Sequence, residues 1–296
     1  MNEQQRCGYI AIIGRPNVGK STLLNGILGQ KISITSPKPQ TTRSQILGIK
    51  TVDSTQAIYI DTPGWHDNQK GAMNRYLNRL ATSVIMDANV ILFMITATQF
   101  TAEDEKVLSH LEKVSCPVIL LINKVDTLKD KSRLLPFMEK MREKYDFAAM
   151  IPLSAKKKDN VVELQQTVST LLPEGPHLFP EEQVTDKSVR FQIAELIREK
   201  VIQATEQELP YSTTVEIEHV QTKEKMMDIS AIIWVEREGQ KPIVIGKNGA
   251  RLKKIGTAAR KDIQILVKQK VFLRLWVKVK AHWTEDERTL NSTLPH

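Results

Sequence analysis

Gly14-Arg-Pro-Asn-Val-Gly19-Lys20-Ser21 directly follows the apolar run Tyr9–Ile13 and precedes a helical pattern over residues 19–29. A G-x-x-x-x-G-K-S pattern between a buried strand and a helix predicts a loop that holds a nucleoside triphosphate. Its glycines let successive backbone N–H groups approach the phosphates, and the helix N-terminus adds partial positive charge. We expect Lys20 to reach the β- and γ-phosphates and Ser21 to bind Mg²⁺.

Short apolar runs alternate with helical patterns through the first 172 residues. This alternation predicts an α/β domain built on a doubly wound, mostly parallel sheet that is covered on both faces. Ligands bind such sheets at the carboxyl ends of the strands. The expected strands are 9–13, 57–60, 90–95 and 118–122, and the expected helices lie near 19–29, 71–86, 101–113, 130–145 and 160–172.

Three further motifs follow expected strands. Asp61-Thr-Pro-Gly64 supplies a carboxylate that can hold Mg²⁺ through water and a Gly64 N–H that can sense the γ-phosphate. In Asn123-Lys124-Val125-Asp126, the Asp126 carboxylate can accept both N1–H and N2–H₂ of guanine, whereas adenine would leave that charge unsatisfied. A backbone N–H of Ser154-Ala155-Lys156 can meet guanine O6. The nucleotide is therefore expected to be GTP. We expect it to contact Gly14, Arg15, Pro16, Asn17, Val18, Gly19, Lys20, Ser21, Thr22, Asp61, Thr62, Pro63, Gly64, Asn123, Lys124, Asp126, Ser154, Ala155 and Lys156.

The pattern changes after a proline-rich stretch, which predicts a linker at residues 173–185. Beyond it the sequence predicts a separate, smaller α+β domain at 186–283 and a C-terminal tail at 284–296, so that the first domain spans residues 1–172. The expected order is a helix at 187–205, strands at 213–220 and 226–235, the apolar run 243–245, a helix from Ala250 to about Val267, and a strand at 271–281.

Positive charge is concentrated in this second part. The net charge is +8, but residues 246–283 hold eleven Lys and Arg against the single acid Asp262, a net charge of +10, so the rest of the chain sums to −2. One interpretation is a solvated basic face. The other, favoured by the neighbouring glycine loop Ile245-Gly246-Lys247-Asn248-Gly249, is a polyanion partner.

The first domain resembles a GTPase of the family that includes Era, Der and the tRNA-modification GTPases. The resemblance implies that Thr42, in Pro39-Gln-Thr-Thr-Arg43, closes on Mg²⁺, and that residues 30–45 and 62–72 are switches ordered by the γ-phosphate. Many relatives have Gly where this chain has Gln40. The catalytic set expected from the motifs and the resemblance is Asn17, Lys20, Thr42 and Gly64.

The position after Asp61-Thr-Pro-Gly64 is unusual for a small GTPase. Small GTPases have a Gln there that orients the attacking water, and Trp65 cannot do this. The family resemblance implies that Asn17 instead helps to hold K⁺ beside the phosphates; the alternative is that Asn17 only shapes the loop. His66 is a weaker candidate base. We expect slow intrinsic hydrolysis.

The second domain resembles a type II KH domain, in which a GxxG turn brings the backbone close to about four nucleotides. The expected RNA contacts are Ile245, Gly246, Lys247, Asn248, Gly249, Arg251, Lys253 and Lys254. On the last strand, Phe272 and Trp276 could stack on bases while Arg274 and Lys278 contact phosphates. Alternatively, this face packs on helices or on the first domain.

The two resemblances together imply a GTP-hydrolysing switch that binds the 3′ region of 16S rRNA and acts in assembly of the small (30S) ribosomal subunit. The alternative is an RNA-binding module with a structural, non-switching GTP site. Expected cofactors are GTP/GDP, Mg²⁺ and, through Asn17, K⁺. We expect a monomer that binds no DNA.

Cytoplasmic location is expected because Cys7 and Cys116 have neither metal nor redox spacing and no apolar run approaches the roughly 18 residues of a membrane span. The family resemblance also implies peripheral contact with the inner membrane, where the basic segment could meet anionic lipid.

Overall fold

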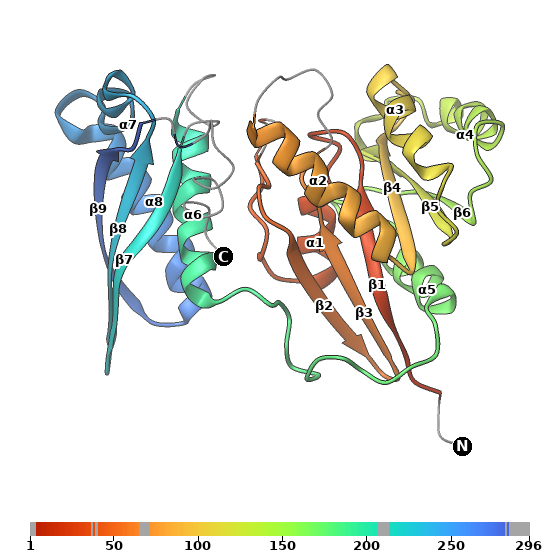
Figure 1. Ribbon diagram of the computed structural model, residues 1–296, viewed down its shortest axis with the longest axis horizontal. Helices are drawn as coiled ribbons and strands as arrows, with labels where there is room; N and C mark the ends of the chain where they lie inside the picture. Colours follow the sequence, from red (N-terminus) through yellow and green to blue (C-terminus); the bar gives the residue numbers. More distant parts are fainter. Residues whose placement is uncertain are drawn as a thin grey trace. The chain divides into compact units, whose positions relative to one another are not determined.

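The computed structural model describes residues 4–36, 38, 41–64, 72–205, 213–281 and 283 (Figure 1). The chain divides into two compact units, and each is described by itself. The first comprises Met1–Ser33, Gln45–Gln69 and Leu77–Asp186, and the second comprises Ile34–Ser44, Lys70–Tyr76 and Lys187–His296.

A six-stranded sheet forms the centre of the first unit, in the order β2-β3-β1-β4-β5-β6. All neighbouring strands are parallel except the edge pair β2 and β3, which confirms the predicted doubly wound, mostly parallel sheet. The strands are β1 (Arg6–Ile13), β2 (Ile46–Val52), β3 (Thr55–Asp61), β4 (Val90–Thr96), β5 (Val118–Asn123) and β6 (Ala149–Pro152).

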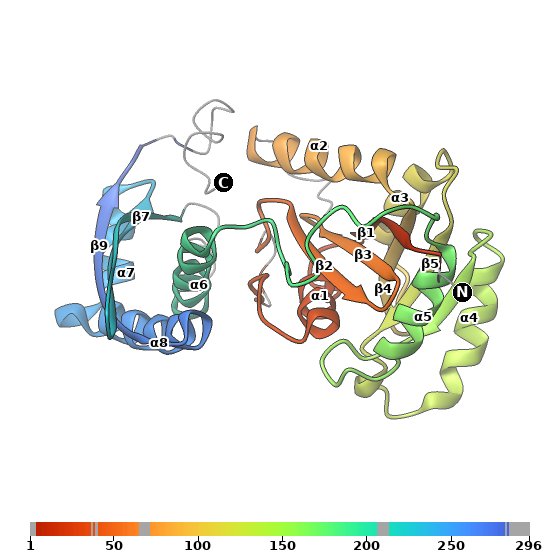
Figure 2. The same cartoon turned by 90° about the horizontal axis from the view of Figure 1, so that it is seen from below.

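Helices cover both faces of this sheet, as Figure 2 shows for α1 and α5 on one side and α2 on the other. Apolar side chains of α2, α3 and α4 form one core with β1, β4 and β5. Leu23 and Leu24 of α1 and Leu164 of α5 are completely buried. The helices are α1 (Lys20–Leu28), α2 (Ala72–Asp87), α3 (Ala102–Leu111), α4 (Leu134–Arg142) and α5 (Val161–Leu171).

The proline-rich segment predicted as a linker hydrogen-bonds to the first unit. Gly175 N donates to Gln5 O at 2.9 Å, and Ile49 N donates to Val184 O at 2.8 Å. Phe179 also packs against a small apolar cluster that includes Ile58. The segment is thus grouped with the first unit as far as Asp186.

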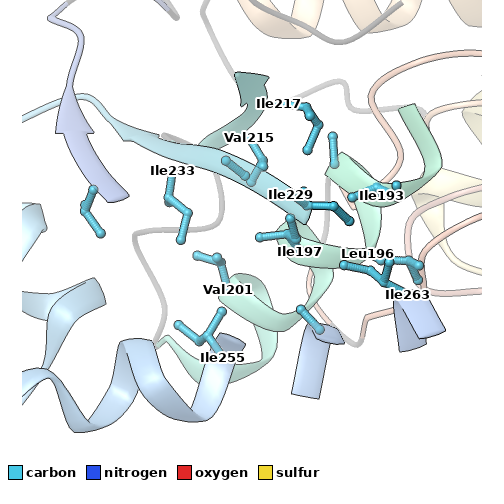
Figure 3. Close-up of a cluster of buried hydrophobic side chains, with 14 of the residues drawn as sticks. Ile193, Leu196, Ile197, Val201, Val215, Ile217, Ile229, Ile233, Ile255 and Ile263 are labelled. Carbon is cyan, nitrogen blue, oxygen red and sulfur yellow. The ribbon is translucent and has the colours of Figure 1, made fainter. Parts of the chain in front are cut away.

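The second unit has a three-stranded sheet, β7-β8-β9, with β7 antiparallel and β9 parallel to β8. Figure 3 shows its core, in which α6 contributes Ile197 and Val201, β8 contributes Ile229 and Ile233, and α8 contributes Ile255. Its elements are α6 (Val189–Ala204), β7 (Thr214–Lys223), β8 (Met226–Val235), α7 (Lys241–Ile245), α8 (Ala250–Val267) and β9 (Lys270–Val279). The helix–strand–strand–helix–strand order is as predicted, with the addition of the short helix α7, formed around the apolar run 243–245.

Candidate GTP and RNA sites

The loop between β1 and α1 has a backbone that glycine makes possible. Gly14, Asn17 and Gly19 have φ angles of 146°, 63° and 113°. A Cβ at Gly14 would lie 2.4 Å from Met94 O, and a Cβ at Gly19 would lie 2.3 Å from Asn123 Nδ2. The loop thus lies tightly against the ends of β4 and β5 and leads into the N-terminus of α1, where backbone N–H groups can bind phosphate.

Lys20 is almost fully buried at the start of α1, at 6% exposure. Its Nζ donates to Gly14 O at 2.9 Å and to Arg15 O at 3.0 Å. Burial lowers the pKa of Lys20 to about 8, with the Arg15 charge acting in the same direction and the Asp61 charge against it. Phosphate groups would compensate the buried ammonium charge, so the lysine is suited to an anionic ligand.

Ser21 and Asp61 lie together at the mouth of this loop. Ser21 Oγ donates to Asp61 Oδ2 at 2.7 Å, and Ser33 Oγ donates to the same oxygen at 2.7 Å. Asp61 is completely buried at the end of β3. A hydroxyl beside a carboxylate, next to a phosphate loop, is a donor set that fits Mg²⁺. Ser33 was not predicted, because no motif surrounds it.

Gly64 approaches the phosphate-binding loop closely. A Cβ there would lie 2.9 Å from Pro16 Cγ and 3.0 Å from both Pro16 Cα and Pro16 N. Thr62 Oγ1 donates to Ile12 O at 2.8 Å, which holds the segment just before Gly64 on β1. The structure therefore brings Asp61-Thr-Pro-Gly64 to the loop. Trp65 and His66 lie outside the described residues.

Side chains of the motif Asn123-Lys124-Val125-Asp126 hydrogen-bond to the backbone of the phosphate-binding loop and of Ala155. Asn123 Nδ2 donates to Val18 O at 2.6 Å, while its Oδ1 accepts from Ala155 N at 2.9 Å. Lys124 Nζ donates to Asn17 O at 2.7 Å. Burial is the largest cause that lowers the pKa of Lys124, with Arg15 adding to the effect. Asn123 thus connects three segments.

Asp126 and Ser154 form the remaining pair of this site. Ser154 Oγ donates to Asp126 Oδ1 at 2.6 Å, which fixes the carboxylate at the end of β5. Of the three residues Ser154-Ala155-Lys156, from which a backbone N–H was expected to meet guanine O6, Ala155 donates its N–H to Asn123 Oδ1. Lys156, the next residue, is exposed. The predicted base-binding residues therefore lie together around the phosphate-binding loop.

Some predicted residues are placed differently from the simplest expectation. The Arg15 side chain is engaged by Asp104, so that its expected contact with the nucleotide would come from its backbone. Asn17 is exposed, with a left-handed backbone. The phosphate-binding loop also contains Pro16 and the fully buried Val18. Thr22 follows in the first turn of α1, and Pro63 lies between Thr62 and Gly64.

Thr42 belongs to the second unit, with the rest of Ile34–Ser44. This segment is held by α6: Thr35 N donates to Glu199 Oε1 at 2.9 Å, and Arg198 Nη2 donates to Thr41 O. Arg43 Nη1 donates to Thr213 O at 2.8 Å. Thr42 itself is buried, and its role as a Mg²⁺ ligand stays a prediction. Pro39 and Gln40 lie outside the described residues.

The second glycine loop joins α7 to α8 and is also left-handed. The φ angles of Gly246, Asn248 and Gly249 are 74°, 52° and 75°. Lys247 and Asn248 are exposed at its tip. Arg251 donates to Ile243 O, which closes α7 onto α8. Ile245 ends α7, while Lys253 and Lys254 are exposed in the first turns of α8.

An open groove of about 540 Å³ lies between α8 and β9. Gly256 lines its wall, and Lys253 and Arg260 supply positive charge. Lys253 was among the RNA contacts expected from the sequence, but Gly256 and Arg260 were not, because they lie about two and three turns of α8 beyond the glycine loop. The lining residues are Gly249, Leu252, Lys253, Gly256, Thr257, Arg260, Phe272, Leu273 and Leu275.

The face of β9 that carries Phe272 and Trp276 is partly exposed, and Phe272 also lines the groove. Phe272 and Trp276 have exposures of 48% and 41%, whereas Val271 and Val277 point into the core. Within the described part of the second unit this face therefore does not pack on helices, while its packing on the first domain stays a prediction. Arg274 Nη2 pairs with Asp228 Oδ1 at 2.9 Å, and Lys278 Nζ lies 3.5 Å from Glu218 Oε1. Both expected phosphate contacts thus have acidic neighbours.

Comparison with known proteins gives matches over both parts of the chain. The family model described as "50S ribosome-binding GTPase" matches residues 9–124, and the KH domain model matches residues 208–284. GTPase Era of Marinobacter nauticus is 52% identical over 291 residues, covering 98% of this chain and 95% of the relative. GTPase Era of Actinobacillus pleuropneumoniae is 54% identical over 294 residues, covering 98% and 97%.

Two solved structures match nearly the whole chain. Era in complex with MgGDPNP and nucleotides 1506–1542 of 16S ribosomal RNA has a TM-score of 0.93 and 39% identity, covering 97% of this chain and 98% of that chain. An Aquifex aeolicus Era variant bound to GDP and AlF₄⁻ has the same TM-score of 0.93, identity of 39% and coverage of 97% and 98%.

Proposed function

This chain belongs to the GTPase Era family, and we propose that it is a nucleotide-controlled switch that binds the 3′ region of 16S rRNA. It is a GTPase that uses GTP, GDP and Mg²⁺. The observation that carries the proposal is that one chain has both a phosphate-binding loop with Asp126 and Ser154, the residues expected to contact guanine, bonded together, and an exposed GxxG loop beside a basic groove.

The chain's own residues account for nucleotide binding. Loop N–H groups and Lys20 hold the phosphates, while Asp126 selects guanine. Mg²⁺ would be held by Ser21 and, through water, by Asp61, and it supplies charge that stabilises phosphoryl transfer. Gly64 lies against Pro16 of the phosphate-binding loop, and its N–H would contact the γ-phosphate and order the second switch.

Asn17 is the residue through which we expect K⁺ to act. It is exposed on the phosphate-binding loop, and its carbonyl is held by Lys124. GTP turnover in KCl should exceed turnover in NaCl, and Asn17→Ala should remove most of that difference. Equal turnover of the unmodified protein in both salts would contradict a role for K⁺.

RNA would bind at the groove between α8 and β9. Backbone of the Gly246–Gly249 turn and the exposed Lys247 and Lys253 would meet phosphates, while apolar walls would receive bases. The support is the KH match over residues 208–284 and the related Era structure solved with 16S rRNA nucleotides. Assembly of the small ribosomal subunit, binding as a monomer and a cytoplasmic location belong to the same proposal.

Peripheral membrane contact stays a sequence-based prediction. Among the described residues, no helix is long and apolar enough to cross a bilayer.

Direct binding tests the proposed partner. An RNA with the 16S sequence that the related Era structure contains should bind at least about tenfold more tightly than a shuffled RNA of equal length at the same salt concentration. Equal affinity for the two RNAs would contradict sequence-specific recognition and indicate nonspecific electrostatic binding.

A further inference from the structure

The side chain of Arg15 is fixed by two other elements. Its Nε lies 3.1 Å from both Asp104 Oδ1 and Asp104 Oδ2, and its Nη2 donates to Thr96 Oγ1 at 3.2 Å. Thr96 ends β4, and Asp104 lies in the first turn of α3 with no exposed surface. The arginine therefore ties the phosphate-binding loop to both elements.

Asp104 also caps its own helix. Its Oδ2 accepts from Thr101 N and from Thr101 Oγ1, both at 2.9 Å, and the Asp104 N–H donates back to Thr101 Oγ1. A capping box needs only a side-chain acceptor at this position, and an amide oxygen would serve. A fully buried carboxylate, in contrast, requires a compensating charge. Arg15 supplies it.

The same arginine holds Lys20 through its backbone. Lys20 Nζ donates to the carbonyl of Arg15 at 3.0 Å and to that of Gly14 at 2.9 Å. Between Arg15 and Lys20 the loop has positive φ at Asn17, an unfavourable conformation for a residue other than glycine that the surroundings must stabilise. Asp104, Arg15 and Lys20 thus form one connected series.

We propose that Asp104 is a positioning residue for GTP: through Arg15 it holds the phosphate-binding loop in its binding conformation. Asp104 does not touch the nucleotide in this account, which rests on GTP occupying the loop. Without the pair, the loop N–H groups and Lys20 would have to be ordered when nucleotide binds. Binding would weaken and release would accelerate.

The test uses the full-length protein with Asp104→Asn, Arg15→Gln and the double variant. Asp104→Asn retains the size of the side chain and an oxygen for the cap, and removes the charge. GDP release from each single variant should be about tenfold faster than from the unmodified protein, and the double variant should be no faster than either single one. The unfolding temperature of Arg15→Gln should recover in the double variant, because Asp104 is then no longer an unpaired buried charge.

Two variants of α3 separate positioning from loss of stability. Val107→Ala weakens packing of a side chain that is 2% exposed, and Thr101→Ala removes the capping hydroxyl while Arg15 and Asp104 remain. Both should lower the unfolding temperature and leave GDP release nearly unchanged. The inference is overturned if Asp104→Asn releases GDP at the original rate, if it behaves as Val107→Ala does at equal loss of stability, or if the single effects add in the double variant. Failure of the unmodified protein to bind GDP would instead contradict the GTPase function.

Discussion

At the scale of single residues, base choice depends on Asp126. Its carboxylate is fixed by Ser154 Oγ at 2.6 Å, so that it does not have to be ordered when guanine arrives. Guanine offers two adjacent donors to this acceptor, and a base without them would leave the charge unsatisfied. Selectivity therefore depends on an acceptor-only group at this position.

Asp126→Asn should change the preferred nucleotide from GTP to xanthosine triphosphate. An amide offers one donor and one acceptor, so GTP affinity should fall about 100-fold, while xanthosine triphosphate, with an acceptor at C2, should gain affinity. Fluorescence titration with the two labelled nucleotides measures both effects. Asp130→Asn is the matched control, because that exposed carboxylate bonds to Ser132 and should leave GTP affinity unchanged. Equal losses for both nucleotides would show that the residue acts on stability rather than on base choice.

Local spacing predicts some of these residues and not others. Lys20, Ser21 and Asp61 occur in motifs whose spacing itself expresses the chemistry. Asp104 lies 89 residues from Arg15 and has no such motif, and Ser33 lies 28 residues from Asp61. Their roles depend on which strands become neighbours, which only the folded chain shows.

At the scale of elements, continuous apolar runs were the reliable signal. β4 and β5 lie inside the sheet and have almost entirely buried side chains, so their sequences are apolar throughout. The edge strand β2 contains Gly48 and Lys50 and pairs antiparallel with β3, and its pattern was too mixed to predict. The three apolar residues 243–245 were likewise too few to predict the short helix α7 of the second unit.

Gly256 tests the groove as an RNA site. A Cβ there would meet Leu275 Cδ1 at an ordinary 3.4 Å, so alanine fits, while leucine would extend into the groove. Gly256→Leu should weaken binding of the 16S fragment at least about tenfold and leave GTP hydrolysis unchanged, because a helix interior tolerates leucine well. Gly256→Ala should bind RNA within about twofold of the original affinity. Undiminished binding by Gly256→Leu would place the RNA elsewhere.

At the scale of the whole molecule, the sequence predicts two domains that follow one another along the chain. In the structure, two segments of the predicted first domain are grouped with the second unit. Ile34–Ser44 and Lys70–Tyr76 are inserted in the first fold along the chain but belong to the second unit by contact. Both overlap the predicted switches at 30–45 and 62–72. No sequence pattern predicts this grouping, because the hydrogen-bond partners of Thr35 and Thr41 lie on α6, more than 150 residues away.

This grouping gives the proposed switch a physical basis. If Thr42 closes on Mg²⁺ when GTP binds, the bonds of Glu199 and Arg198 to the neighbouring Thr35 and Thr41 would connect that change to α6. A nucleotide can control RNA binding only if the two nucleotide states differ in their affinity for RNA. The domain boundaries and the Mg²⁺ role of Thr42 stay predictions within this account.

The most direct test is RNA affinity in the two nucleotide states. The 16S fragment is titrated against full-length protein loaded with Mg²⁺ and either GDP or a non-hydrolysable GTP analogue, at one fixed salt concentration. A switch predicts affinities that differ by at least about fivefold, with the same factor recovered when nucleotide affinity is measured with and without RNA. Equal RNA affinity in both states would contradict the switch and leave an RNA-binding protein whose GTP site is structural.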